Sequence, residues 1–171
     1  MWNPAYVTPE VANIVSPKIV AMAVKRAKRP MFVLGSLLNT FPEEIAISTI
    51  EIGKILKEKY GTTLVSTGGS YLTLSKYLEP DAKIGLIDLI NNLKNPYWEG
   101  FDGRGNYDLI LFIGVPYYIA TQGLSTLKHF APHLRTITLC RFMHPNADYS
   151  FPNLSNEEWL DYLNKLKNLL Q

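Results

Sequence analysis

All three histidines of the chain and its only cysteine fall within one stretch of residues 129–144, HFAPHLRTITLCRFMH. Imidazole and thiolate groups bind zinc, and a thiolate beside an imidazole can act as a nucleophile with its base. The first two histidines are four residues apart, but Pro132 lies between them, and the residue before a proline avoids helical geometry. No second cysteine and no H-E-x-x-H motif accompany them. We therefore expect no catalytic set and no metal site, but residues packed at the end of a sheet or lining a subunit contact: His129, His133, Cys140 and His144.

Small residues that follow apolar runs form a second group of candidates. In an open parallel sheet, ligands bind beyond the carboxyl ends of the strands, where small residues let a phosphate approach backbone N–H groups. The sequence has neither G-x-G-x-x-G nor the P-loop pattern G-x-x-x-x-G-K-[ST]. Two interpretations stay open: tight turns that any such fold needs, or a nucleotide crevice of unusual kind. In the second case the cofactor-binding residues would be Gly35, Ser36, Thr67, Gly68, Gly69, Ser70 and Gly114.

The strands that would position these residues are continuous apolar runs, as in a sheet covered on both faces. We expect parallel strands near residues 31–35, 62–66, 109–113 and 136–139. Between them, apolar residues at helical spacing predict helices over 17–28, 71–78, 84–94 and 117–130.

Two capping boxes, a Ser or Thr followed three residues later by Glu, predict the starts of two further helices. Thr40 with Glu43 would begin a helix that ends at Gly61, and Ser155 with Glu158 would begin the last one. The last helix should bury Trp159, Leu163, Leu166 and Leu170. Strands alternating with helices predict a three-layer α/β fold with a mostly parallel, Rossmann-like sheet. We expect one domain over 16–171, preceded by an arm over 1–15 that folds on its own domain or is lent to a partner.

Composition narrows the function classes. The chain has 171 residues, a net charge of +2 and one cysteine. A near-neutral balance with one short basic run, Lys25 to Arg29, does not suggest nucleic acid. One cysteine excludes an internal disulfide and a self-contained iron–sulfur cluster, and it fits a reducing compartment. Without a signal peptide or an apolar run of about 20 residues, we expect a cytoplasmic protein with no membrane partner.

Three stretches carry a resemblance to a known family. The segments AKRPMFVLGS, YWEGFDGRGNYD and NYDLILFIGVPYYIATQGLSTLKHFAPHLRTITLCRFMHPNADYSFPNLS resemble the epsilon subunits of the archaeal acetyl-CoA decarbonylase/synthase complex, also called carbon monoxide dehydrogenase epsilon subunits. The resemblance covers nearly the whole chain. It implies a fold similar to the NAD/FAD-binding domain of deoxyhypusine synthase.

The resemblance also implies a partner and a role. An epsilon chain accompanies a large alpha subunit, which carries the nickel–iron–sulfur cluster and the CO dehydrogenase activity, in an α2ε2 assembly of methanogenic and related archaea. We expect an accessory subunit that stabilises this assembly and assists electron transfer to FAD, without a tightly bound cofactor of its own. The alternatives are a free-standing flavin- or nucleotide-dependent enzyme on the same fold and a regulatory nucleotide sensor.

Overall fold

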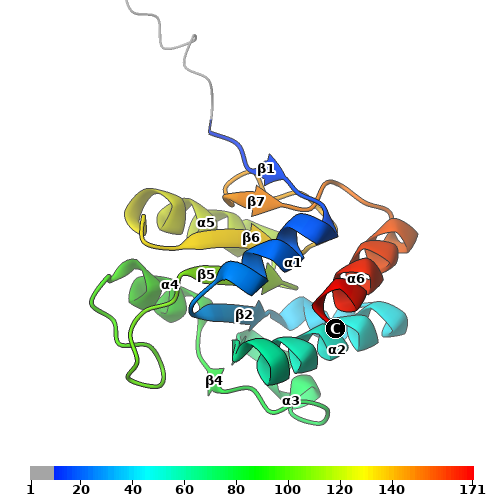
Figure 1. Cartoon of the computed structure of the whole chain (residues 1–171), viewed down its shortest axis with the longest axis horizontal. Coiled ribbons are helices and arrows are strands. Elements are labelled where there is room, and N and C mark those ends of the chain that lie inside the picture. Colours follow the sequence, from blue (N-terminus) through cyan, green and yellow to red (C-terminus); the bar gives the residue numbers. More distant parts are fainter. Residues whose placement is uncertain (1–9) are drawn as a thin grey trace, which may run out of the picture.

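A seven-stranded sheet, all of whose neighbouring strands run parallel, forms the centre of the molecule in the computed structural model, which describes residues 10–171 (Figure 1). The strand order is β1-β7-β6-β5-β2-β3-β4. Four strands confirm the predicted positions, and three two-residue strands, β1, β4 and β7, were not predicted. The bounds of the seven strands are β1 Asn13–Ile14, β2 Pro30–Leu34, β3 Thr63–Ser66, β4 Ala82–Lys83, β5 Leu109–Ile113, β6 Arg135–Thr138 and β7 Tyr149–Ser150.

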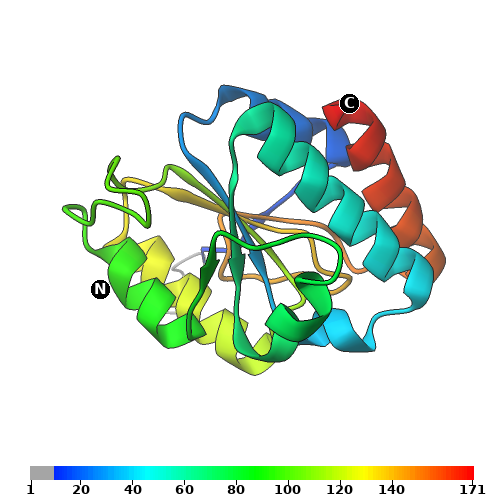
Figure 2. The same cartoon turned by 90° about the horizontal axis from the view of Figure 1, so that it is seen from below.

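Helices cover both faces of the sheet, which confirms the three-layer α/β prediction. Figure 2 shows α2 and α6 on one side of the sheet and α4 and α5 on the other. The helix bounds are α1 Pro17–Arg26, α2 Glu43–Tyr60, α3 Tyr71–Leu74, α4 Leu86–Lys94, α5 Tyr117–Phe130 and α6 Asn156–Leu170, with 3₁₀ helices η2 Ser36–Thr40 and η3 Gly68–Ser70. Within residues 10–171, no helix is both long and apolar enough to cross a membrane.

The alternation of side chains along each strand makes two cores. In β5, Leu109 and Leu111 face the core under α1, α2 and α6, while Ile110 and Phe112 face the core under α4 and α5. All four are 5% exposed or less. This burial on both faces explains why the central strands are continuous apolar runs rather than alternating ones.

The two predicted capping boxes have opposite outcomes. At Ser155 the box is complete, with the hydroxyl accepting from Glu158 N–H, and α6 buries its four predicted residues. At Thr40 the prediction was wrong, because the chain first turns through η2 and α2 begins after Pro42 without a side-chain cap. The Thr40 hydroxyl instead donates to the carbonyl of Leu37. The end of α2 at Gly61, with φ of 59°, confirms the predicted stop.

Two further differences concern short elements. The helix predicted for 71–78 spans only α3 and continues as turns. The predicted arm over 1–15 lies mostly outside the described residues, while β1 within it pairs in parallel with β7 at the edge of the sheet.

The order of the strands reverses between β2 and β5. From β2 the chain continues outward through β3 and β4, and from β5 it continues in the opposite direction through β6 and β7. Such a reversal separates the loops that leave two adjacent strands, and in open α/β sheets it is the usual place for a ligand. The carboxyl ends of β2 and β5 therefore define where a small-molecule site is expected.

Candidate functional site

The predicted glycine turns come together at this reversal. A Cβ atom added to Gly35 would lie 2.2 Å from the carbonyl oxygen of Gly114, so only glycine allows the two turns to approach. Gly114 itself has a φ of 71°, and its carbonyl oxygen accepts from Leu37 N–H at 2.8 Å. The first turn after β2 is therefore built directly against the turn after β5.

The turn after β3 is bound to the same structure. The Ser70 hydroxyl donates to the carbonyl of Leu34 at 2.9 Å, and the Asn39 amide donates to the carbonyl of Gly69 at 3.1 Å. A Cβ atom added to Gly68 would lie 3.3 Å from the Cβ of Ser36. The structure thus brings all three predicted turns to one edge of the sheet.

Two backbone N–H groups of these turns are bonded within the chain and so are not free for a phosphate. The N–H of Gly35 donates to the carbonyl of Ile113 and that of Thr67 to the carbonyl of Leu34, both at 2.9 Å. The helix that follows the turn after β3 is α3, which has only four residues, so its dipole would attract an anion weakly. Cofactor binding by the seven residues stays a prediction.

A cavity of about 380 Å³ adjoins the reversal, and we call it the switch-point cavity. Of the seven predicted residues, its lining includes Gly114. Most of the lining comes from η2, the turn into α5, the segment after β6 and the start of α6: Leu37, Thr40, Phe41, Pro42, Gly114, Val115, Tyr117, Cys140, Arg141, Phe142, His144, Asn156 and Trp159. Phe41 and Trp159 meet edge to face with ring centroids 4.9 Å apart, so two aromatic residues form part of its wall.

His144 is the most unusual polar group of this cavity. The residue is 2% exposed, and its Nδ1 is buried without a hydrogen-bond partner among the described residues. Its ring stacks on Tyr117, with centroids 4.4 Å apart. Burial lowers the pKa of His144 to about 4, so the imidazole is neutral at pH 7. A buried polar atom without a partner costs about 1–3 kcal/mol, which marks this site as one where a polar group serves something other than stability.

Arg141 brings a positive charge to the cavity. Its Nε donates to the carbonyl of Leu154 at 3.1 Å and its Nη1 to Asn156 Oδ1 at 2.8 Å, while the guanidinium lies over the Phe142 ring. Within the part of the chain that the structure describes, no carboxylate forms an ion pair with it. The neighbouring Cys140 adds no charge, because burial raises the pKa of its thiol to about 11.

The other two histidines lie away from this cavity. His129 is exposed at the end of α5, where its ring lies near Phe130. The Nε2 of His133 lies 3.0 Å from the carbonyl oxygen of Leu93 and 3.1 Å from the Asn106 amide. Among residues 10–171, no three His, Cys, Asp or Glu side chains converge as metal ligands. The fold therefore separates His129 and His133 from Cys140 and His144, which both line the cavity.

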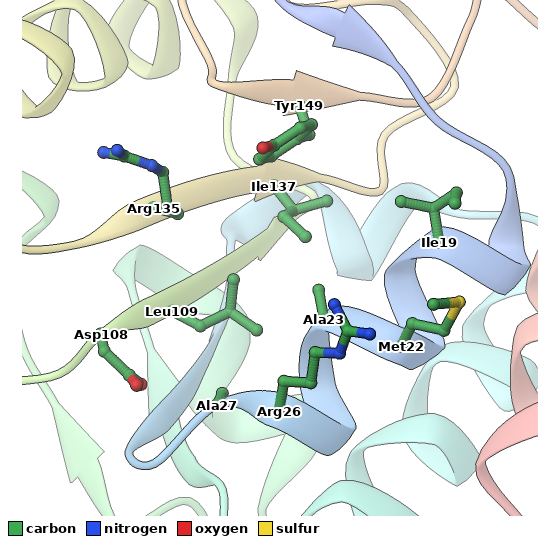
Figure 3. A pocket seen from close by; sticks show the side chains of 10 residues that line it. All are labelled: Ile19, Met22, Ala23, Arg26, Ala27, Asp108, Leu109, Arg135, Ile137 and Tyr149. Carbon is green, nitrogen blue, oxygen red and sulfur yellow. The ribbon is translucent and has the colours of Figure 1, made fainter.

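A second hollow, the α1 groove, lies where α1 crosses the sheet and has a volume of about 390 Å³ (Figure 3). Its floor consists of Leu109 and Ile137 from β5 and β6, and Ile19 and Met22 of α1 line its other side. The full lining is Ile19, Met22, Ala23, Arg26, Ala27, Asp108, Leu109, Arg135, Ile137 and Tyr149. Ile19 and Met22 are 45% and 39% exposed, so this groove presents apolar side chains to the surface.

The rim of the α1 groove is mainly basic. Arg26 and Arg135 are exposed and, among residues 10–171, form no ion pair with a carboxylate. Asp108 is engaged elsewhere, since its carboxylate accepts from the backbone N–H groups of Lys28 and Arg29 at 2.8 and 2.9 Å. The groove therefore combines an apolar floor with two exposed arginines at its rim.

Neither hollow has a direct signal in the sequence. The apolar positions of α1 predicted a single face, but the structure divides them: Val20 and Val24 enter the core, while Ile19, Ala23 and Ala27 line the groove. Arg141 and Tyr117 carried no motif, because they reach the cavity from segments far apart in the chain.

Comparisons with known proteins all point to the same protein family. The family model described as CO dehydrogenase beta subunit/acetyl-CoA synthase epsilon subunit matches residues 3–167. The acetyl-CoA decarbonylase/synthase complex subunit epsilon of Methanothermobacter thermautotrophicus is 42% identical over 166 residues, covering 96% of this chain and 92% of the relative. That of Methanothrix soehngenii is 37% identical over 86% of this chain and 76% of the relative. Subunit epsilon 1 of Archaeoglobus fulgidus is 38% identical over 88% and 79%.

Proposed function

Since this chain belongs to the family of acetyl-CoA decarbonylase/synthase epsilon subunits, as the resemblance predicted, we propose that it binds the large CO dehydrogenase subunit and stabilises an α2ε2 assembly. In this role the chain supplies a binding surface, and the chemistry of CO oxidation belongs to the partner.

The α1 groove is the surface that supports this role best. Its exposed Met22 and Ile19 beside a buried sheet floor would lose apolar area from water on contact with a partner, which is the main driving force of stable association. Its arginines at the rim would favour carboxylates on that partner. We assign to the groove a segment of the large subunit that is apolar along its centre and acidic at its ends.

The second role implied by the resemblance, help with electron transfer to FAD, remains a separate proposal without assigned residues. In the turn after β2, the N–H of Gly35 is already bonded to the carbonyl of Ile113 within the chain. A flavin analysis of the assembly purified from its native host tests this role independently of the contact surface.

Co-purification with the large subunit tests the proposed contact. We compare the unmodified chain with Met22→Glu in the α1 groove and with Ile87→Glu on α4, a matched control that also introduces a charge at an exposed apolar residue. We expect Met22→Glu to weaken the complex at least tenfold, because it places a carboxylate on an apolar contact, while Ile87→Glu assembles normally.

Two results would overturn the proposal at different levels. If the unmodified chain does not bind the large subunit, the accessory role is wrong, and turnover by the chain alone with a bound flavin would favour the free-standing enzyme. If the chain binds but both variants assemble equally well, the role stands and the α1 groove is not the contact.

A further inference from the structure

The switch-point cavity has the composition of a small-molecule site, although the proposed function does not use it. It lies beside the reversal between β2 and β5, the place where α/β sheets bind ligands. Its volume of about 380 Å³ lies within the range of small-molecule pockets, about 300–1,000 Å³. Its walls include the aromatic rings of Phe41, Trp159 and Phe142, which suit a flat apolar body.

Two polar features of the cavity favour a negative group on the ligand. Arg141 keeps guanidinium N–H groups beyond the two that bond Leu154 and Asn156, and guanidinium binds carboxylates and phosphates. The cavity also reaches the start of α5, which has 14 residues, no side-chain cap and no acidic residue in its first turn. The first N–H groups of a helix have no partner within it, and the helix dipole makes this end attractive to anions.

His144 is the independent sign of a ligand. This residue lines the cavity and is only 2% exposed. Its ring stacks on that of Tyr117, the first residue of α5. Its Nδ1 has no hydrogen-bond partner among the described residues. The lining contains no Asp or Glu, so no acidic side chain there neutralises Arg141.

We propose that the switch-point cavity binds a small organic anion, a single carboxylate or phosphate group on a flat aromatic body, with the anion held by Arg141 at the start of α5. A dinucleotide would need a second anion cradle, and in the glycine turns beside the cavity the N–H groups of Gly35 and Thr67 are bonded within the chain. The inference stands apart from the contact with the large subunit, because the α1 groove and this cavity share no lining residue.

Calorimetric titration of the full chain with phenyl phosphate and with benzoate tests the inference. Phenol, a ring without the anion, and inorganic phosphate, an anion without the ring, are the control ligands. We expect saturable 1:1 binding of at least one aromatic anion, at least tenfold tighter than either control. Arg141→Gln should weaken it at least tenfold. Arg104→Gln, at an arginine 73% exposed in another region, should leave it unchanged.

Nuclear magnetic resonance of the unmodified chain provides a second readout that does not depend on a variant. The ring signals of His144 and Tyr117 should shift with the titration, while those of His129 should not. Three results would overturn the inference: neither aromatic anion binds saturably, inorganic phosphate binds as tightly as phenyl phosphate, or Arg141→Gln binds as the unmodified chain does. FAD binding that is tighter than either probe and insensitive to Arg141→Gln would also overturn it.

Discussion

The α1 groove and the switch-point cavity have almost the same volume but opposite chemistry. The groove is an aliphatic surface formed by one helix and three strands, with its arginines exposed at the rim. The cavity is formed by loops and helix starts, with aromatic walls and a buried imidazole at 2% exposure. The two hollows therefore differ in where their polar groups lie and not in their volume.

This difference indicates different occupants. Charges at the rim of an apolar surface keep their hydration until a partner arrives, and they steer association rather than hold a small molecule. A buried donor or acceptor without a partner is costly in the free protein, so it is expected where a ligand completes it. The groove therefore suits a protein partner, and the cavity suits a compact ligand.

The largest difference between the two regions should appear in stability. Trp159 is 4% exposed, contacts Phe41 and donates its indole N–H to the carbonyl of Leu139 at 2.7 Å. We expect Trp159→Ala to lower the free energy of unfolding by about 3–5 kcal/mol. Met22→Ala in the groove should lower it by no more than about 0.5 kcal/mol, because that side chain is partly exposed. Urea denaturation measures both, and equal losses would remove the distinction between them.

Acid should destabilise the cavity through His144. The folded pKa of about 4 lies below the unfolded value of 6.5, so the unfolded chain takes up the proton first as the pH falls. The stability that His144 contributes is complete above pH 6.5 and is lost towards pH 4, by up to about 3 kcal/mol.

Urea denaturation of the unmodified chain and of His144→Gln, each at pH 7, 5 and 4, measures this loss. The variant should lose less stability than the unmodified chain between pH 7 and 4, and the exposed control His129→Gln should follow the unmodified chain. Parallel curves for the unmodified chain and His144→Gln would mean that the imidazole is not held neutral by burial.

A smaller difference in stability is expected between Ser155 and Thr40, the two residues that the sequence predicted as helix caps. Ser155 caps α6, which carries Asn156 and Trp159 to the lining, so Ser155→Ala should lower the free energy of unfolding by about 1 kcal/mol. Thr40 also lines the cavity but caps no α-helix, so Thr40→Ala should change it by no more than about 0.5 kcal/mol. Thermal unfolding of the two variants compares them, and a reversed order would contradict the cap assignments.

These regions also show what the sequence could predict. Runs such as Leu109–Ile113 identified the central strands, because burial on both faces leaves a local signal. The two-residue strands β1, β4 and β7 left none, since their pairing partners are supplied by the rest of the sheet. The pattern Thr40 to Glu43 matched a capping box, but the turn of η2 against Gly114 took the chain elsewhere. That contact spans more than 70 residues of chain and has no local pattern.

The candidate site could also be predicted only in part from the sequence. The glycine turns were predicted to gather at one edge, because the carboxyl ends of parallel strands share an edge, and they do gather. Their bonding to each other depends on contacts across three loops, which spacing does not encode. The two hollows were not predicted, because α1 had to be placed on the sheet before Met22 could be distinguished from Val24.

Hydrogen exchange of the chain, alone and assembled with the large CO dehydrogenase subunit, tests the central claim most directly. The proposed contact predicts slower exchange on assembly in α1 and in the neighbouring strands β6 and β7, with α4 unchanged. Protection confined to α4, with α1 exchanging as in the free chain, would contradict the assignment of the α1 groove as the surface that binds the large subunit.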